Sequence, residues 1–206
     1  MKNIILISII NIVLGLCNSL SAQLNDTLSY NESILSMRIE NDSLLKYSKN
    51  SPLPDSMQVG FKGISYFDVD ERYRVSAKFI RTTKEPEFGM KTTTTRLPIY
   101  RKYGIAIFSL NGVKCELNIY QNVELIKKEE YKNHLFIPYT DETSGIECYA
   151  GGRYIDVEIP KGEIIIIDFN LSYNPYCNYN SRYSCPIPPV DNDLSIRIEA
   201  GEKDFH

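Results

Sequence analysis

Four segments of this chain alternate apolar and polar residues with a period of two, and this pattern most constrains the fold. The segments cover residues 72–79, 113–120, 155–159 and 194–199. Successive side chains of a strand point to opposite faces, so each segment predicts a strand with one buried and one solvent-exposed face. Strands of this type are common in antiparallel sheets that pack one face on a core.

Two further segments, 105–110 and 164–167, are apolar on both faces and are predicted to be central strands. Asn111-Gly112 separates the first of them from the strand that begins at Val113, and this pair is typical of a type I′ hairpin turn. Several short strands with hairpin signals predict a mainly β chain that forms an antiparallel β-barrel or β-sandwich.

One N-terminal α-helix is expected before the strands, over about residues 29–47. Ser29 and Glu32 have the spacing of a capping box, in which each side chain bonds the backbone N–H of the other residue. Three apolar residues share one face of this helix: Ile34, Met37 and Leu44. The sequence Ser-Pro-Leu-Pro at 51–54 then ends it, because proline cannot continue the helical ladder.

Residues 1–22 have the features of a secretory signal peptide. Lys2 precedes a short apolar run, and Leu20-Ser-Ala22 is a suitable cleavage site before Gln23. The alternative is lipoprotein processing at Cys17, although the bulky Leu16 disfavours it. No later segment approaches the roughly 20 apolar residues of a membrane span. The expected location is outside the cytoplasm, in the periplasm.

The mature chain, residues 23–206, is expected to form a single β-rich domain. Its length is sufficient for one sizeable core, and it contains no internal repeat. The full sequence has a formal net charge of −3, and removal of Lys2 with the signal makes it more acidic. A mildly acidic surface disfavours nucleic acid and anionic membranes as partners.

Four cysteines remain after the signal is removed, and an even number in an exported chain permits disulfides. Cys177 and Cys185 are the natural pair, because they flank a loop rich in Asn, Tyr and Pro that needs closing. A bridge across so short a loop would contribute about 2–3 kcal/mol. Cys115 and Cys148 are interpreted as small buried residues.

Histidine is scarce, which limits the chemistry that the chain can perform. His206 is the last residue, so only His134 is expected in an ordered core, and a multi-histidine metal site is excluded. A catalytic triad would need His134 with a nucleophile, for which the candidates are Ser144, Cys148 and Cys177. No phosphate loop or dinucleotide fingerprint occurs, so no cofactor and no metal are expected.

A polar cluster at the strand ends is the candidate site. Asp168 and Asn170 follow the 164–167 strand and are expected on one face of it, because side chains two apart point the same way. Arg153, at the start of another strand, is a suitable bidentate partner for Asp168 or Asp141. The candidate ligand-binding residues are Asp141, Arg153, Asp168, Asn170, Tyr173, Asn174 and Tyr176.

Two interpretations of this cluster remain open. In the first, Arg153, Asp168 and Asn170 form a structural hydrogen-bond network that ties down the 171–189 loop. In the second, they line a pocket for a small polar ligand such as a sugar, with walls formed by Tyr173, Tyr176, Tyr179 and Tyr183. A glycosidase-like hydrolase using Asp141 or Glu142 with Asp168 is an alternative. A purely structural or interaction protein is another.

The order of several short blocks resembles a bacterial and archaeal family, the domain of unknown function numbered sixteen-eighty-four. These blocks include 61–67, 135–138, 152–154, 168–170, 173–177, 185–189 and 200–203. The resemblance covers nearly the whole mature chain, and the Tyr-Asn-Pro-x-Cys…Cys-Pro-x-Pro-Pro block is its most specific part. The resemblance implies which family the chain is related to and how much of the chain the family domain covers, but it implies no mechanism. Because relatives include cytoplasmic proteins, it also implies a packing or thiol role for Cys177 and Cys185 as an alternative to a bridge.

Overall fold

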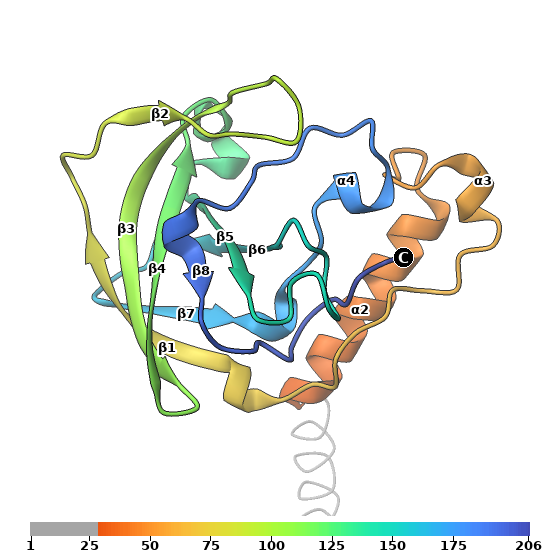
Figure 1. Ribbon diagram of the computed structural model, residues 1–206, viewed down its shortest axis with the longest axis horizontal. Helices are drawn as coiled ribbons and strands as arrows, with labels where there is room; N and C mark the ends of the chain where they lie inside the picture. Colours follow the sequence, from red (N-terminus) through yellow and green to blue (C-terminus); the bar gives the residue numbers. More distant parts are fainter. Residues whose placement is uncertain (1–28) are drawn as a thin grey trace, which may run out of the picture. The chain divides into compact units, whose positions relative to one another are not determined.

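An eight-stranded sheet organises the computed structural model, which describes residues 29–206 (Figure 1). The strands are β1 Arg74–Arg81, β2 Glu87–Gly89, β3 Ile99–Leu110, β4 Val113–Asn122, β5 His134–Asp141, β6 Arg153–Glu158, β7 Ile164–Asp168 and β8 Asp193–Leu194. Six of them pair antiparallel in the order β6-β5-β4-β3-β1-β7. In addition, β2 pairs antiparallel with β3, and β8 pairs parallel with β5.

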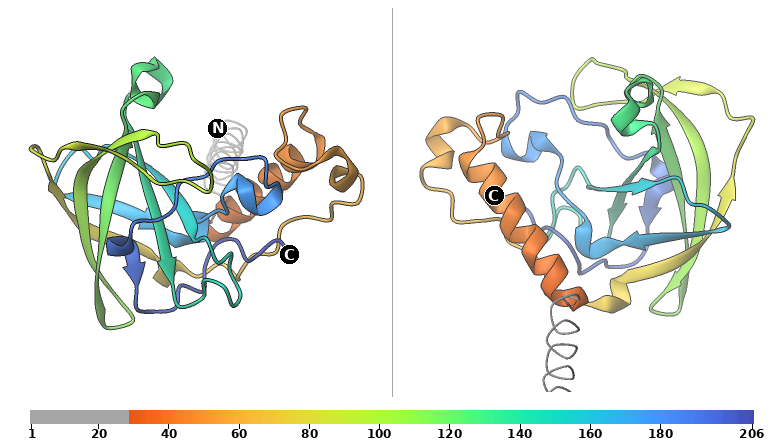
Figure 2. Two further views of the ribbon diagram at one scale, coloured as in Figure 1. Left: turned by 45° about the horizontal axis from the view of Figure 1, so that its top comes forward. Right: turned by 180° about the vertical axis from the view of Figure 1, so that it is seen from behind.

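The sheet curls into a half-barrel that packs its concave face on the main core (Figures 1 and 2). On β1, Val75, Ala77 and Phe79 point into this core, while the residues between them are exposed. The same alternation places Leu117 and Ile119 of β4 in the core. The prediction of a mainly β antiparallel chain with an N-terminal helix is therefore confirmed.

The β3–β4 hairpin forms as its sequence predicts. Asn111 and Gly112 both have positive φ angles, 52° and 80°, as a two-residue type I′ turn requires. Leu110 pairs directly with Val113 across this turn, and the register continues along both strands with one irregularity near Lys102.

Two strand predictions were wrong in part. Strand β7 lies at one end of the paired row instead of its centre, and Ile164 and Ile166 are largely exposed, at 57% and 42%. Four consecutive isoleucines give no apolar-polar alternation in the sequence, yet only alternate isoleucines of this strand are buried. In the 194–199 segment, Ile196 and Ile198 are buried, but β8 ends at Leu194. Residues 195–199 are therefore extended and bury alternate side chains, but they do not form a strand that pairs along its whole length.

Helix α2, Tyr30–Tyr47, starts with the predicted capping box. The Ser29 N–H donates to Glu32 Oε2 at 2.8 Å, and the Glu32 N–H donates to Ser29 Oγ at 3.3 Å. Residues 34–206 form one compact unit, and Ser33 is the last residue of a separate N-terminal unit. The predicted signal peptide, residues 1–22, lies outside the described residues.

The apolar face of α2 differs from the prediction. Ile34 and Leu45 are its buried residues, whereas Met37 and Leu44 are exposed to 43% and 57%. Leu45 joins a small core with Leu53 and Phe61. Met37 and Leu44 instead border a cavity described below.

The C-terminal segment returns to this helical side of the unit, where the C-terminus lies beside α2 in both views (Figures 1 and 2). Two short α-helices follow α2 in the described chain, α3 Asp55–Gln58 and α4 Tyr176–Tyr179, and the remaining helical segments are single 3₁₀ turns. His206 Nε2 lies 2.8 Å from the carbonyl oxygen of Asn178 in α4, so the terminal histidine is held although it is exposed. Within residues 29–206, no helix has both the length and the apolar content that crossing a bilayer requires.

Candidate functional site

A cavity of about 830 Å³ is the candidate site. Its walls come from α2, from β5 and β6, and from the 170–186 segment. The four tyrosines that the sequence predicted as aromatic walls all line it: Tyr173, Tyr176, Tyr179 and Tyr183. Four further tyrosines that the sequence did not single out also line it: Tyr66, Tyr100, Tyr131 and Tyr154. The cavity is therefore an aromatic one, with polar groups between its rings.

The predicted site residues divide into two groups. Asn170, Tyr173, Asn174 and Tyr176 line the cavity, whereas Asp141, Arg153 and Asp168 do not. The structure thus separates the tyrosine-rich segment from the charged residues that the sequence grouped with it.

Arg153 and Asp141 form a fully buried ion pair. Arg153 Nη2 lies 2.6 Å from Asp141 Oδ2, and neither side chain is exposed. The same guanidinium donates to the carbonyl oxygens of Ile198, at 2.9 Å, and Ala200. These contacts identify Asp141, not Asp168, as the partner of Arg153, and the pair holds the C-terminal segment to β5 and β6.

Asp168 and Asn170 form a second structural network. Strand β7 ends at Asp168, which caps a short 3₁₀ helix by accepting from the Asn170 N–H at 3.0 Å. The Asn170 side chain exchanges two hydrogen bonds with the backbone of Asp70, at 3.0 and 2.8 Å. Asn170 therefore does not continue the strand face of Asp168, as was predicted, but fastens the chain at Asp70.

A line of polar groups that the sequence did not reveal crosses one wall of the cavity. His134 Nε2 lies 2.9 Å from Asp156 Oδ1, and the Tyr173 hydroxyl donates to Asp156 Oδ2 at 2.7 Å. All three residues line the cavity. His134 and Asp156 are 22 residues apart in the chain, and the pairing of β5 with β6 brings them together. No local sequence motif therefore predicts this pair.

Glu202 is a buried carboxyl group of the cavity wall, with only 2% of the residue exposed. Its Oε2 accepts from the Tyr179 hydroxyl at 2.6 Å and from the Asn174 N–H at 2.7 Å. Burial raises the pKa of Glu202 to about 7, although these two hydrogen bonds oppose the rise. Glu202 was not among the predicted site residues, because it lies far along the chain from Asn174 and Tyr179.

Asn174 supplies a buried acceptor without a partner. The residue is 1% exposed, and its Nδ2 donates to the Lys203 carbonyl oxygen at 2.7 Å. No hydrogen-bond partner reaches its Oδ1 within residues 29–206. A buried polar atom in this state costs roughly 1–3 kcal/mol unless water or a ligand satisfies it.

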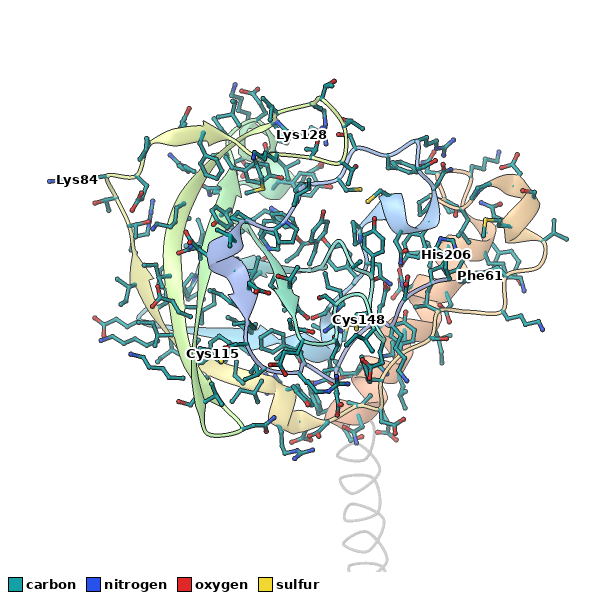
Figure 3. All side chains as sticks on the ribbon, viewed as in Figure 1. Phe61, Lys84, Cys115, Lys128, Cys148 and His206 are labelled. Carbon is teal, nitrogen blue, oxygen red and sulfur yellow. The ribbon has the colours of Figure 1, made fainter. Side chains whose placement is uncertain are left out.

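All four cysteines of the described chain are free, so the predicted Cys177–Cys185 disulfide is not formed in the structure. The two residues nevertheless lie together, because the Cys177 N–H donates to Cys185 Sγ at 3.1 Å. Cys115 and Cys148 are buried, as predicted. They are well separated in Figure 3.

The nucleophile and carboxylate arrangements considered for an enzyme are not assembled. The described contacts of His134 go to Asp156 and to the ring of Tyr131, and none goes to Ser144, Cys148 or Cys177. Asp141 is paired with Arg153, and Asp168 is outside the cavity wall. Among residues 29–206, no group of three or more His, Cys, Asp and Glu residues is placed to hold a metal ion.

Comparisons with known proteins identify relatives without a described activity. A family profile described as a protein of unknown function, DUF1684, matches residues 59–203. The solution NMR structure of an uncharacterised protein from Haloarcula marismortui, from gene locus rrnAC0354, is similar with a TM-score of 0.64 and 32% sequence identity. That similarity covers 83% of this chain and 92% of the other. No curated protein matches the sequence.

Replacement of Arg153 should be strongly destabilising. Arg153→Met leaves Asp141 buried without its cation, which costs about 3–5 kcal/mol of the free energy of unfolding. Arg197→Met removes two partly exposed pairs, with Glu147 and Glu199, and should cost about 1 kcal/mol or less. Urea denaturation of both variants measures the difference, and equal losses would contradict a special role for the buried pair.

Glu202 should make stability depend on pH. Its pKa is about 7 in the folded chain against an ordinary value of 4.5, so folding favours the protonated form. This contribution is fully present below pH 4.5 and is lost as the pH rises through 7. Relative to Glu202→Gln, the wild-type free energy of unfolding should therefore fall between pH 4.5 and 8 by an amount on the order of 3 kcal/mol.

The control for this pH dependence is Glu87→Gln, which changes an exposed glutamate of β2. That variant should keep the wild-type pH profile in urea denaturation. Parallel profiles for Glu202→Gln and the wild type would show that Glu202 does not titrate in this range.

Proposed function

This chain belongs to the DUF1684 family of proteins of unknown function, and from the chemistry of its cavity we propose that it is a binding or accessory protein for a small polar ligand. The proposed ligand is a neutral hydroxyl-rich molecule of the sugar class. The cavity volume of about 830 Å³ is within the range of small-molecule sites, roughly 300–1,000 Å³.

The observation that carries this proposal is the combination of tyrosine rings with a buried, unsatisfied acceptor in one cavity. Tyrosine rings offer an apolar face on which a sugar ring can stack. Asn174 also lines this cavity, and its Oδ1, which is covered by neighbouring atoms, has no partner among the described residues, so a rotation of the side chain would present this acceptor to a ligand. A ligand hydroxyl that donates to this oxygen would remove its desolvation cost, and this gain favours a ligand that carries donors.

The charges around the cavity favour a neutral ligand over an anionic one. Asp156 and Glu202 line the walls together with one basic side chain, Arg38, so the wall has no excess of positive charge that would hold a phosphate or carboxylate. Both carboxyl groups already accept hydrogen bonds from Tyr173 and Tyr179, respectively. They therefore position tyrosine hydroxyls along the wall, where those oxygens can still accept a hydrogen bond from a ligand.

Export to the periplasm is a second part of the proposal, and it rests on the pattern of residues 1–22. Expression of the full chain should give a periplasmic protein that begins at Gln23, which intact mass measurement checks. Retention of residues 1–22 on a cytoplasmic product would exclude the signal, and a lipid-modified Cys17 would support the lipoprotein alternative.

A ligand of the proposed class should stabilise the protein against heat. In a thermal-denaturation screen of monosaccharides and disaccharides, a sugar at 100 times its Kd should add about 2.7 kcal/mol. Tyr176→Ala should weaken binding by about 1 kcal/mol or more, roughly fivefold in Kd, because it removes a half-exposed ring from the cavity wall.

The matched control is Tyr47→Ala. Tyr47 is a 74% exposed tyrosine at the end of α2 that does not line the cavity, so this variant should bind as the wild type does. Failure of every sugar to shift the melting temperature of the folded wild type, or equal loss of binding in both variants, would reject the proposal.

A further inference from the structure

We infer that Cys177 and Cys185 form a dithiol site that exchanges with small disulfides, with Cys177 as the attacking thiol and Cys185 as the resolving thiol. The site is independent of the proposed ligand. It borders the same cavity, because Cys185 is part of the cavity wall.

The first observation is the proximity of the two thiols. The Cys177 N–H donates to Cys185 Sγ at 3.1 Å, although eight residues separate them in the chain. Backbone hydrogen bonds from Asn180 to Tyr176, and from Tyr183 to Asn180, fold the intervening chain back on itself. Both cysteines are free in the structure, so a reduced pair is already held together.

The second observation is that the two cysteines differ in accessibility. Cys177 lies in α4 and is partly exposed, whereas Cys185 is only 6% exposed. Segment 185–187 is fixed on a neighbouring segment by hydrogen bonds between Cys185 and Thr93, at 2.9 and 3.1 Å, and between Ile187 and Lys91. A disulfide from solvent can therefore reach Cys177 before it reaches Cys185.

The third observation is a set of donors that stabilises a thiolate at Cys177. The Cys185 thiol is the strongest of them, and the hydroxyl of Tyr149, at 3.7 Å from Cys177 Sγ, and that of Thr93 also contribute. Against the opposing effect of burial, these hydrogen bonds lower the pKa of Cys177 to about 6. The hydrogen bond to Cys177 and burial both raise the pKa of Cys185.

Two other ionisable groups lie close to the pair, and the first of them acts against this assignment without reversing it. The Arg96 guanidinium donates to the Ser184 carbonyl oxygen at 2.7 Å and lies near Cys185, where it partly offsets the rise in the pKa of that thiol. Burial raises the pKa of Tyr149 to about 12, so its hydroxyl stays protonated and can donate to the thiolate.

The proposed exchange has two balanced steps. The Cys177 thiolate attacks one sulfur of a disulfide R–S–S–R, forms a Cys177–S–S–R bond and releases one thiolate RS⁻, which takes a proton. Cys185 then loses its proton, and its sulfur attacks Cys177 Sγ and displaces the second RS⁻. The products are two RSH molecules and one Cys177–Cys185 disulfide, so the small disulfide is reduced and the protein dithiol is oxidised.

Glutathione disulfide and trypsin test this proposal, because the two cysteines fall in different tryptic peptides, 162–182 and 183–197. In the wild type, the folded full chain should yield these peptides joined by a disulfide and free of glutathione. In Cys185→Ser, peptide 162–182 should instead retain one glutathione. Peptides that carry the buried Cys115 and Cys148 are internal controls and should remain unmodified.

Iodoacetamide alkylation of the wild type gives a second readout that needs no variant. The alkylation rate of Cys177 should rise with a midpoint near pH 6, and Tyr149→Phe should shift this midpoint upward. A midpoint near the ordinary thiol value of about 8.5, or a wild type that keeps glutathione on Cys177 beside a free Cys185, would overturn the proposal. Sugar binding is measured separately, so either proposal can fail alone.

Discussion

The buried pair between Arg153 and Asp141 is the interaction on which the rest of this structure depends. An arginine in the interior of a β protein is costly unless its charge and its N–H groups are satisfied. Here one carboxylate supplies the counter-charge, and backbone carbonyl oxygens of the C-terminal segment accept further hydrogen bonds from Nη1 and Nη2, while Nε has no partner among the described residues. The planar guanidinium can make these contacts in several directions at once, which a lysine could not do.

This arrangement links the fold to the cavity. The C-terminal segment has few ladder hydrogen bonds of its own, because β8 is only two residues long. Arg153 fixes that segment at Ile198 and Ala200, immediately before Glu202. Glu202 can then meet Tyr179 and the backbone of Asn174 with short hydrogen bonds. The Arg153–Asp141 pair, which lies outside the cavity wall, thus helps to place the Glu202 carboxyl group, with its raised pKa, in that wall.

Much of the fold followed from local patterns in the sequence. The capping box at Ser29, the Asn111-Gly112 turn and the alternation in β1 each encode a backbone geometry within a few residues, so their prediction needs no tertiary information. The central position expected for residues 164–167 failed because four consecutive isoleucines do not reveal which of them are buried. Sheet order depends on contacts between distant segments, and these leave no local pattern.

The candidate site shows the same division between local and distant information. The tyrosines of the 173–183 segment were predicted because they lie close together in the sequence, and they do share one cavity. The His134–Asp156 pair was missed because it forms only when β5 and β6 align. Arg153 and Asp168 were placed with the tyrosines because charged residues at strand ends can serve a network or a pocket equally well.

Hydrogen-bond satisfaction distinguishes these two roles in the folded chain. The Asp141 carboxylate is occupied by Arg153, and the Asn170 side chain is occupied by the backbone of Asp70, so neither group is free to recognise a ligand without a loss of stability. Asn174 is as deeply buried as Asn170, yet its Oδ1 has no partner in the described chain. Several other buried atoms of the described chain also lack a partner, but Asn174 Oδ1 is the one such oxygen that belongs to a residue of the cavity wall. Asn174 is therefore the residue through which the proposed ligand would gain most, whereas Arg153 belongs to the scaffold that supports the cavity wall.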